Sequence, residues 1–121
     1  MGRAKVLVVD DDTIIRELVK LHLASNGYDV RVAEDAVEAG HLILREVPSL
    51  IILDVAMPYM DGYEFATALK HDPATQHIPI VFLTGEDSID EHADRIGAAA
   101  YLKKPVTANR LLEVVRQHAE S

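Results

Sequence analysis

The chain has 121 residues, of which 49% are hydrophobic, and it carries a formal net charge of −8. Residues 1–121 are therefore expected to form a single domain with a real hydrophobic core. The acidic balance argues against nucleic-acid or membrane binding, because such surfaces need clustered lysine and arginine. The absence of cysteine excludes a disulfide framework, a zinc–thiolate site and a cysteine nucleophile. Because the sequence has no apolar run long enough to span a membrane and no signal-peptide pattern, we expect a soluble cytoplasmic protein.

The sequence alternates between apolar runs typical of strands and patterns typical of amphipathic helices. Strands are indicated by continuous β-branched residues, and in one case by the alternation of an outer strand. In chain order, the expected elements are a strand over 5–9, a helix ending near Asn26–Gly27, an outer strand over 28–33, a helix over 35–46, a strand over 49–55, a helix over 61–71, a strand over 78–84, a short polar helix over 87–96, a strand over 99–104 and a final helix after Thr107.

Five strand–helix units in succession predict an α/β fold, because parallel strands need helical crossovers between them. These crossovers are right-handed, which places helices on both faces of an open, doubly wound sheet. In such sheets the working site lies beyond the carboxyl ends of the strands.

Chemically active side chains gather at that predicted edge. Asp10 and Asp11 follow the first strand, Asp54 ends the third, Thr84 ends the fourth and Lys104 ends the fifth. Each pair of carboxylates near 4 Å would repel by about 4 kcal/mol at an effective dielectric near 20. A divalent cation offsets this repulsion, and an all-oxygen site suits Mg²⁺ or Mn²⁺. With a hydroxyl, an ammonium and a spare carboxylate nucleophile, the site is equipped for phosphoryl transfer.

Other polar residues have simpler interpretations. Asp12 precedes the first helix, so we expect it to cap that helix rather than to bind metal. Thr107 is a candidate cap for the last helix. The histidines lack the spacing of metal ligands and are interpreted as surface or helix-face residues: His22, His41, His71, His77, His92 and His118.

Four segments resemble the response-regulator receiver domain of two-component signalling, in its single-domain, chemotaxis-receiver-like form. They are "VLVVDDD" (6–12), "LDVAMPYMDGYEF" (53–65), "IPIVFLTG" (78–85) and "AAAYLKKP" (98–105). They occur in the family's order and cover nearly the whole chain. The resemblance implies a flavodoxin-like (βα)5 fold whose five-stranded parallel sheet has the order 2-1-3-4-5.

The resemblance also implies roles for the acidic residues. Asp54 matches the phosphoacceptor, and Asp10 and Asp11 match the pair that holds the metal, with Asp11 the direct ligand. The backbone carbonyl two residues after the phosphoacceptor, here Ala56, is a further metal ligand in the family.

Other positions match the family's switch and its structural loop. Thr84 and Lys104 match the hydroxyl and the lysine that contact the phosphoryl group, and Tyr101 matches an aromatic that moves between exposed and buried positions. The bond between Lys104 and Pro105 matches one that is usually cis. Met57–Pro58 and Asp61–Gly62 match the loop before the third helix.

Two features depart from the family pattern. Ala56 is small and apolar where many relatives carry a longer side chain, and Glu86 adds negative charge near the site. We expect this pair to set the lifetime of phosphorylated Asp54. The segment from Thr84 to Lys104 is slightly short, which affects the usual signalling face of fourth helix, fifth strand and fifth helix.

The implied function is a phosphorylation-dependent switch that is not an enzyme with a separate substrate. A histidine kinase or His-phosphotransfer protein would donate phosphate to Asp54, and a downstream protein would read the altered surface. One alternative is a Mg²⁺-dependent phosphatase of the haloacid-dehalogenase type, which usually has a second aspartate where this chain has Ala56. Another is a flavodoxin-like cofactor binder, which needs a glycine-rich loop where this chain has aspartates. The domain either acts alone or belongs to a longer regulator.

Overall fold

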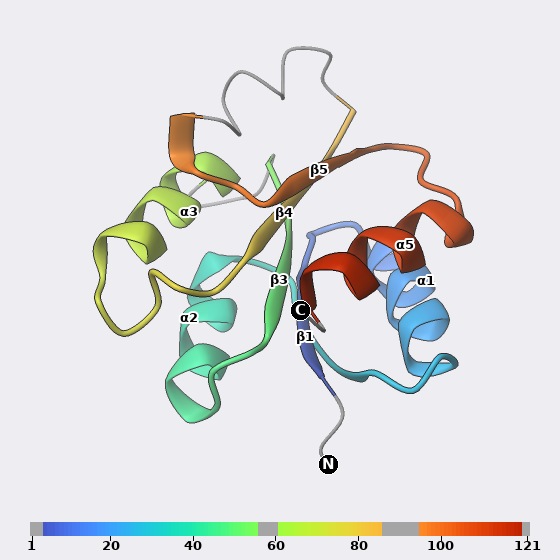
Figure 1. Cartoon of the computed structure of the whole chain (residues 1–121), viewed down its shortest axis with the longest axis horizontal. Helices are drawn as coiled ribbons and strands as arrows, with labels where there is room; N and C mark the ends of the chain where they lie inside the picture. Colours follow the sequence, from blue (N-terminus) through green and yellow to red (C-terminus); the bar gives the residue numbers. More distant parts are fainter. Residues whose placement is uncertain (1–3, 56–60, 86–94, 120–121) are drawn as a thin grey trace.

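The computed structural model describes residues 4–55, 61–85 and 95–119, and five strands within them form one parallel sheet (Figure 1). The sheet has the order β2-β1-β3-β4-β5, which confirms the predicted order. The strands are β1 (Lys5–Val9), β2 (Asp29–Ala33), β3 (Leu50–Asp54), β4 (Ile80–Thr84) and β5 (Ala100–Lys103).

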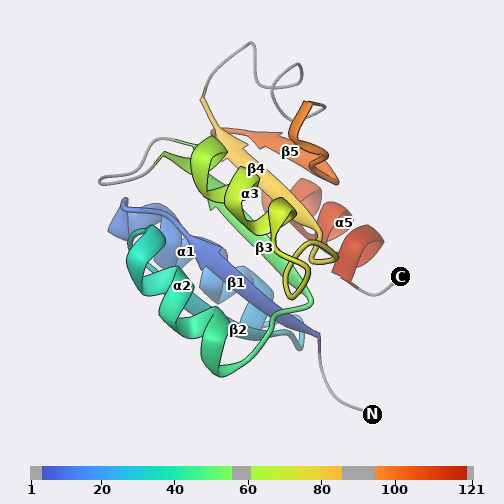
Figure 2. The ribbon, with the colours of Figure 1, turned by 90° about the vertical axis from the view of Figure 1, so that its left-hand side faces the viewer.

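Helices cover both faces of the sheet, as the doubly wound prediction requires. The described helices are α1 (Thr13–Ala24), α2 (Ala36–Arg45), α3 (Gly62–His71) and α5 (Ala108–Ala119). Figures 1 and 2 show α1 and α5 on one face and α2 and α3 on the other. Of the helix expected over 87–96, only Arg95 and Ile96 lie in the described part, and both are helical.

Two hydrophobic clusters, one on each face, hold these layers together. Successive strand residues point to opposite faces, so Leu7 and Val9 pack under α2 and α3, while Val6 and Val8 pack under α1 and α5. All five residues of β3 and of β4 are buried. This two-sided burial explains why the central strands read as continuous apolar runs.

Local signals fix the helix ends where the sequence indicates. The Asp12 carboxylate accepts hydrogen bonds from the N–H groups of Ile14 at 2.9 Å and Ile15 at 3.2 Å, which confirms it as the cap of α1. Gly27 adopts a φ of 91° after that helix, a conformation that favours glycine. The Thr107 hydroxyl accepts a hydrogen bond from the Arg110 N–H at 3.2 Å, so its predicted capping role is also confirmed.

The strand boundaries are slightly narrower than expected from sequence. The fourth strand begins at Ile80 rather than at 78, and the fifth spans Ala100–Lys103 rather than 99–104. Pro79 has no N–H to donate, although its carbonyl still accepts a hydrogen bond from Ile51 N–H at 3.0 Å. No helix among the described residues is long and apolar enough to cross a bilayer.

Candidate functional site

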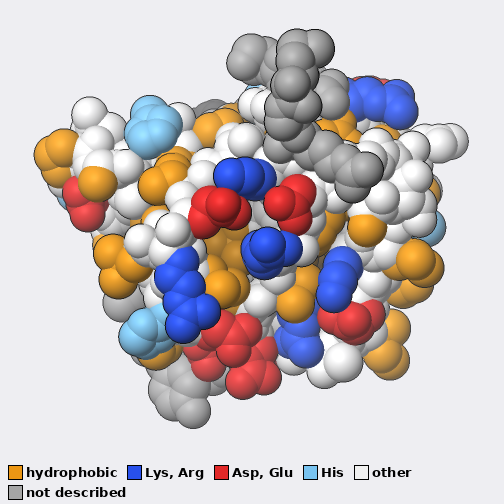
Figure 3. Space-filling model, turned by 90° about the horizontal axis from the view of Figure 1, so that it is seen from below, with side chains coloured by type: hydrophobic (Ala, Val, Ile, Leu, Met, Phe, Trp, Pro, Cys, Tyr) orange, Lys and Arg blue, Asp and Glu red, His pale blue; other side chains and the backbone are white. Residues whose placement is uncertain are grey.

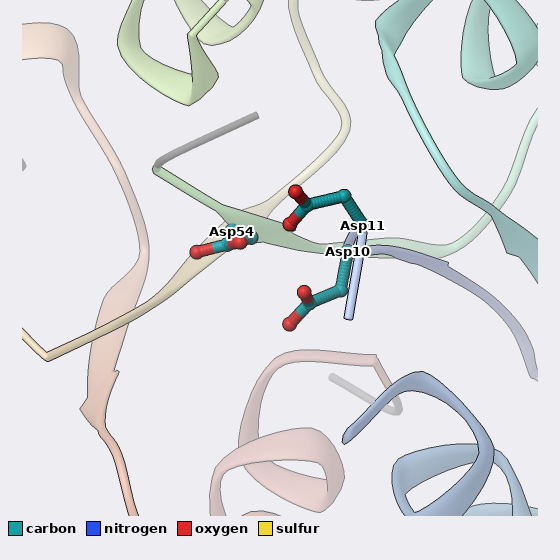
Figure 4. Close-up of side chains that lie close together, drawn as sticks. All are labelled: Asp10, Asp11 and Asp54. Atoms are coloured by element: carbon teal, nitrogen blue, oxygen red, sulfur yellow. The ribbon is translucent and has the colours of Figure 1, made fainter. Parts of the chain in front are cut away.

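The carboxyl ends of four strands bring the predicted site residues together. Asp10 and Asp11 follow β1, and Asp54 is the last residue of β3. Figure 4 shows the side chains of the two N-terminal aspartates extending on the side where Asp54 lies. Each aspartate offers a carboxylate oxygen within 4.8 Å of the oxygens of the other two. Asp11, Asp54, Thr84 and Lys104 also line one hollow of about 520 Å³.

Asp10 is the most constrained member of this group, because its side chain is completely buried. Its Oδ1 accepts a hydrogen bond from Asp12 N–H at 2.9 Å. Its Oδ2 lies 3.3 Å from Lys104 Nζ, an ion pair without a hydrogen bond of regular geometry among the described residues. A buried carboxylate oxygen served only by an ion pair retains capacity for a further positive ligand.

Lys104 connects two of the three carboxylates. Its Nζ lies 3.3 Å from Asp10 Oδ2 and 3.5 Å from Asp54 Oδ1. Burial opposes the charged ammonium, but the nearby carboxylates of Asp54 and Asp10 outweigh burial and raise the pKa of Lys104 above its ordinary value. The contribution of the Lys104 charge to stability is therefore fully present at neutral pH and is lost as the pH rises through that raised pKa.

The charges of the site fit a divalent metal ion. Three carboxylates face one ammonium, so two negative charges remain unbalanced within the cluster. Carboxylate oxygens are the hard ligands that Mg²⁺ and Mn²⁺ prefer. Asp11 is exposed while Asp10 and Asp54 are buried, so the site has both a rigid inner side and an open outer side. An open side suits Mg²⁺, which usually keeps several of its waters.

Thr84 and Tyr101 lie on the neighbouring strands. Thr84 is buried at the end of β4, and its carbonyl accepts a hydrogen bond from Lys104 N–H at 2.7 Å. This bond ties the backbones that carry the hydroxyl and the ammonium. Tyr101 lies on the edge strand β5 with 37% of its surface exposed, and its role as a switch aromatic stays a prediction.

The loop residues named from sequence fall partly outside the described residues. Of these, the residues outside the described part are Ala56, Met57, Pro58 and Glu86. Their expected roles therefore stay predictions. The Lys104–Pro105 peptide bond is cis, as expected. Gly62 begins α3 directly against the backbone of Asp54 and Val55, and its N–H donates to the Val55 carbonyl at 2.8 Å.

Arg16 is a residue near the site that the sequence reasoning did not name. Its guanidinium donates a hydrogen bond to the Asp10 backbone carbonyl at 2.9 Å. Its side chain is only 14% exposed, so this contact holds the turn between β1 and α1 from the inside. Its position in the sequence could have indicated this contact. Arg16 is the first basic residue after the three aspartates, and it lies on the first turn of the helix that Asp12 caps.

The strand order and the acidic carboxyl edge define a flavodoxin-like class of α/β domain. The sequence model of the response regulator receiver domain matches residues 6–116. Response regulator MprA of Mycobacterium leprae is 39% identical over 114 residues, covering 93% of this chain and 49% of that protein. The chain belongs to the response regulator receiver domain family of two-component signalling, and it spans about half the length of the curated relatives it matches.

Solved structures agree with this assignment. Chemotaxis protein CheY4 of Vibrio cholerae superimposes with a TM-score of 0.91 at 35% identity, covering 97% of this chain and 99% of that one. The receiver domain of NtrX from Brucella abortus gives a TM-score of 0.86 at 34% identity, with coverage of 96% and 98%. None of these comparisons supports the alternatives of a haloacid-dehalogenase phosphatase or a flavin-binding protein.

Proposed function

We propose that this domain is a phosphorylation-dependent switch that accepts a phosphoryl group on Asp54. The observation that carries this proposal is the placement of Asp54 beside two further carboxylates and the Lys104 ammonium in one open hollow. The domain would promote its own phosphorylation and dephosphorylation without turning over a separate substrate.

In the proposed reaction, an Asp54 carboxylate oxygen attacks phosphorus and forms an acyl phosphate. The bond from phosphorus to a histidine nitrogen of the donor breaks, and the bonding pair stays on that nitrogen. Lys104 pairs with a phosphoryl oxygen, and the Thr84 hydroxyl donates a hydrogen bond to another. Asp10, Asp11, Asp54 and the Ala56 carbonyl would hold Mg²⁺ or Mn²⁺, which when bound neutralises charge on the phosphoryl oxygens.

Phosphorylation would then shift the populations of two surface states. Thr84 is buried, so its movement toward the phosphoryl group would leave space beneath β5 that Tyr101 can fill. The surface read by a downstream protein would include β5 and α5. Ala56 and Glu86 would set how long the phosphorylated state lasts.

The test is intact mass after incubation with Mg²⁺ and acetyl phosphate or phosphoramidate. We expect one phosphoryl adduct that requires Mg²⁺ and disappears when Asp54 is replaced by alanine. An adduct that persists in the Asp54→Ala variant would refute the assigned phosphoacceptor. No adduct in a folded, metal-binding protein would refute the switch chemistry itself.

The exposed apolar side chains on the outer face of α1 support the proposal that the phosphodonor is a protein. Ile14, Leu18 and Leu21 recur at helical spacing and are 72%, 50% and 59% exposed. The stripe starts three residues after Asp11, so a partner helix packed on it would lie beside the acidic site. A kinase or His-phosphotransfer domain built from helices would place its phosphohistidine there.

Replacing Leu18 by aspartate is expected to slow phosphoryl transfer from a protein donor at least about tenfold, because it puts a charge in an apolar contact. Phosphorylation by acetyl phosphate should stay unchanged, since the small donor does not need α1. The measurement is transfer from autophosphorylated histidine kinases of the source organism, using the fastest donor. Leu44→Asp, an equally apolar exposed position on α2, serves as the control. Equal slowing by both variants, or slowing with acetyl phosphate, would contradict this docking face.

A further inference from the structure

The outer face of α2 carries apolar side chains that the fold leaves uncovered. Leu44 is 86% exposed and Val37 is 58% exposed. They lie seven residues apart, about two helical turns, and therefore on the same face of the helix. His41 lies between them and is also exposed. Single exposed apolar residues are ordinary, but two on one stripe, with no described residue packed over them, form an unpartnered helix face.

Gly40 lies on the same helix, and the fold does not require a glycine there. A Cβ added at position 40 would meet no heavy atom within 4 Å, and the residue does not need a positive φ. Glycine inside a helix weakens it relative to alanine. A glycine allows another backbone to approach closely. Its presence beside the exposed stripe therefore indicates that a helix of another molecule packs on α2.

The charges beside the stripe are complementary under a two-fold axis. Glu38 and Arg45 are also seven residues apart, so an antiparallel copy of α2 places each beside the other's opposite charge. Arg45 makes no hydrogen bond or ion pair within the described part of the chain. Its charged neighbours around the adjacent hollow are already paired, Lys5 with Glu46 at 2.9 Å and Arg31 with Asp29 at 3.0 Å. Figure 3 shows this end of the molecule, where basic and acidic side chains lie side by side.

We propose that this domain self-associates through α2, packed antiparallel on α2 of a second copy. The arrangement puts Val37 against Leu44 of the second copy and Glu38 beside Arg45 of the second copy. The midpoints of both pairs fall within one residue of His41. A single two-fold axis at His41 therefore forms each of the two contacts twice, once on either side of the axis. Such self-complementarity favours a second copy over a different protein, because a two-fold interface uses the same patch on both sides.

The position of α2 determines how this association relates to signalling. The helix packs on β2 and β1, at the opposite side of the sheet from β5 (Figure 2). Association through α2 therefore leaves the acidic hollow and the Tyr101 edge accessible, and it does not depend on phosphorylation. One helix per copy buries less than the roughly 800 Å² per partner of a standard interface. The dimer is accordingly weak and dependent on concentration.

Disulfide trapping tests this axis directly, because the chain contains no cysteine. In the full chain, His41→Cys places one thiol per copy on the proposed axis. Ala68→Cys is the matched control, since it is an exposed position on α3, which has the same length of 10 residues and covers the same face of the sheet. Under mild oxidation we expect the His41→Cys dimer to form at least tenfold faster than the control dimer, with or without acetyl phosphate and Mg²⁺.

A second variant separates specific packing from thiol reactivity. Adding Leu44→Glu to His41→Cys should return cross-linking to the control rate, while circular dichroism and the Mg²⁺-dependent phosphoryl adduct remain. Equal rates for His41→Cys and Ala68→Cys would overturn the proposal. Cross-linking that Leu44→Glu leaves unchanged, or that occurs only after phosphorylation, would overturn it too. The comparison of cross-linking rates among the cysteine variants, made without acetyl phosphate, does not depend on whether Asp54 is the phosphoacceptor.

Discussion

Alanine at position 62 is expected to destabilise the protein by about 3 kcal/mol or more, the cost of forcing atoms into backbone that has no space. A Cβ on Gly62 would collide with the Asp54 carbonyl oxygen and would lie 2.7 Å from the Val55 Cα. Both are backbone atoms that cannot rotate away. Relief requires moving α3 or the end of β3, so phosphorylation of Asp54 should slow as well.

Gly40→Ala is the matched control for this prediction. Its Cβ meets open space, so the gain in helix propensity should stabilise the chain by about 0.5–1 kcal/mol. Urea unfolding followed by circular dichroism measures both variants. If both substitutions changed the free energy of unfolding in the same direction, the close approach of α3 to the backbone of Asp54 and Val55 would not explain Gly62.

Lys104→Met is expected to act in opposite directions on two properties of the site. The Mg²⁺ affinity should rise about tenfold, or about 1.4 kcal/mol, because the ammonium no longer competes for the carboxylates of Asp10 and Asp54. Formation of the phosphoryl adduct from acetyl phosphate should fall at least about tenfold, because no cationic side chain then pairs with the phosphoryl oxygens. Without Mg²⁺ the variant should also be less stable, since Asp10 remains buried without its ion pair.

Lys103→Met provides the control, because it removes the same charge from the neighbouring exposed residue. A Mg²⁺ titration followed by NMR, together with intact mass after acetyl phosphate, measures both properties. We expect Lys103→Met to change each less than twofold. A fall in Mg²⁺ affinity for Lys104→Met would show that the ammonium organises the acidic site rather than competing with the cation.

The fold could be predicted from sequence because its signals are local and agree with one another. Continuous apolar runs identify β3 and β4 as central strands, and alternation identifies β2 as an edge strand. Strand ends are less well defined, because pairing depends on neighbours distant in sequence. Ile80 begins β4 in register with Ile51 of β3, and nothing within the run from 78 to 84 itself indicates that register.

The membership of the site was predictable for a topological reason. The carboxyl ends of parallel strands share an edge, so the aspartates that follow β1 and the aspartate that ends β3 must be neighbours. The depth of each residue was not predictable: Asp10 is completely buried, yet adjacent Asp11 is exposed. The sequence places Arg16 close to the three aspartates and Gly62 in the loop before α3. It does not show that Arg16 contacts the Asp10 carbonyl or that Gly62 lacks space for a Cβ, because both depend on how α1 and α3 approach the sheet.

The ion pairs of Lys104 connect the edge of the sheet to its centre. Among the described strands, β5 is hydrogen-bonded to β4 alone, yet the residue that follows β5 reaches carboxylates at the ends of β3 and β1. The outermost strand is thus anchored to the centre of the sheet by charge as well as by its own ladder. Any anion that binds in the hollow and draws the ammonium toward itself would weaken the ion pairs of Lys104 with Asp10 and Asp54. A change in charge at the centre of the sheet would in this way reach its edge strand through one side chain.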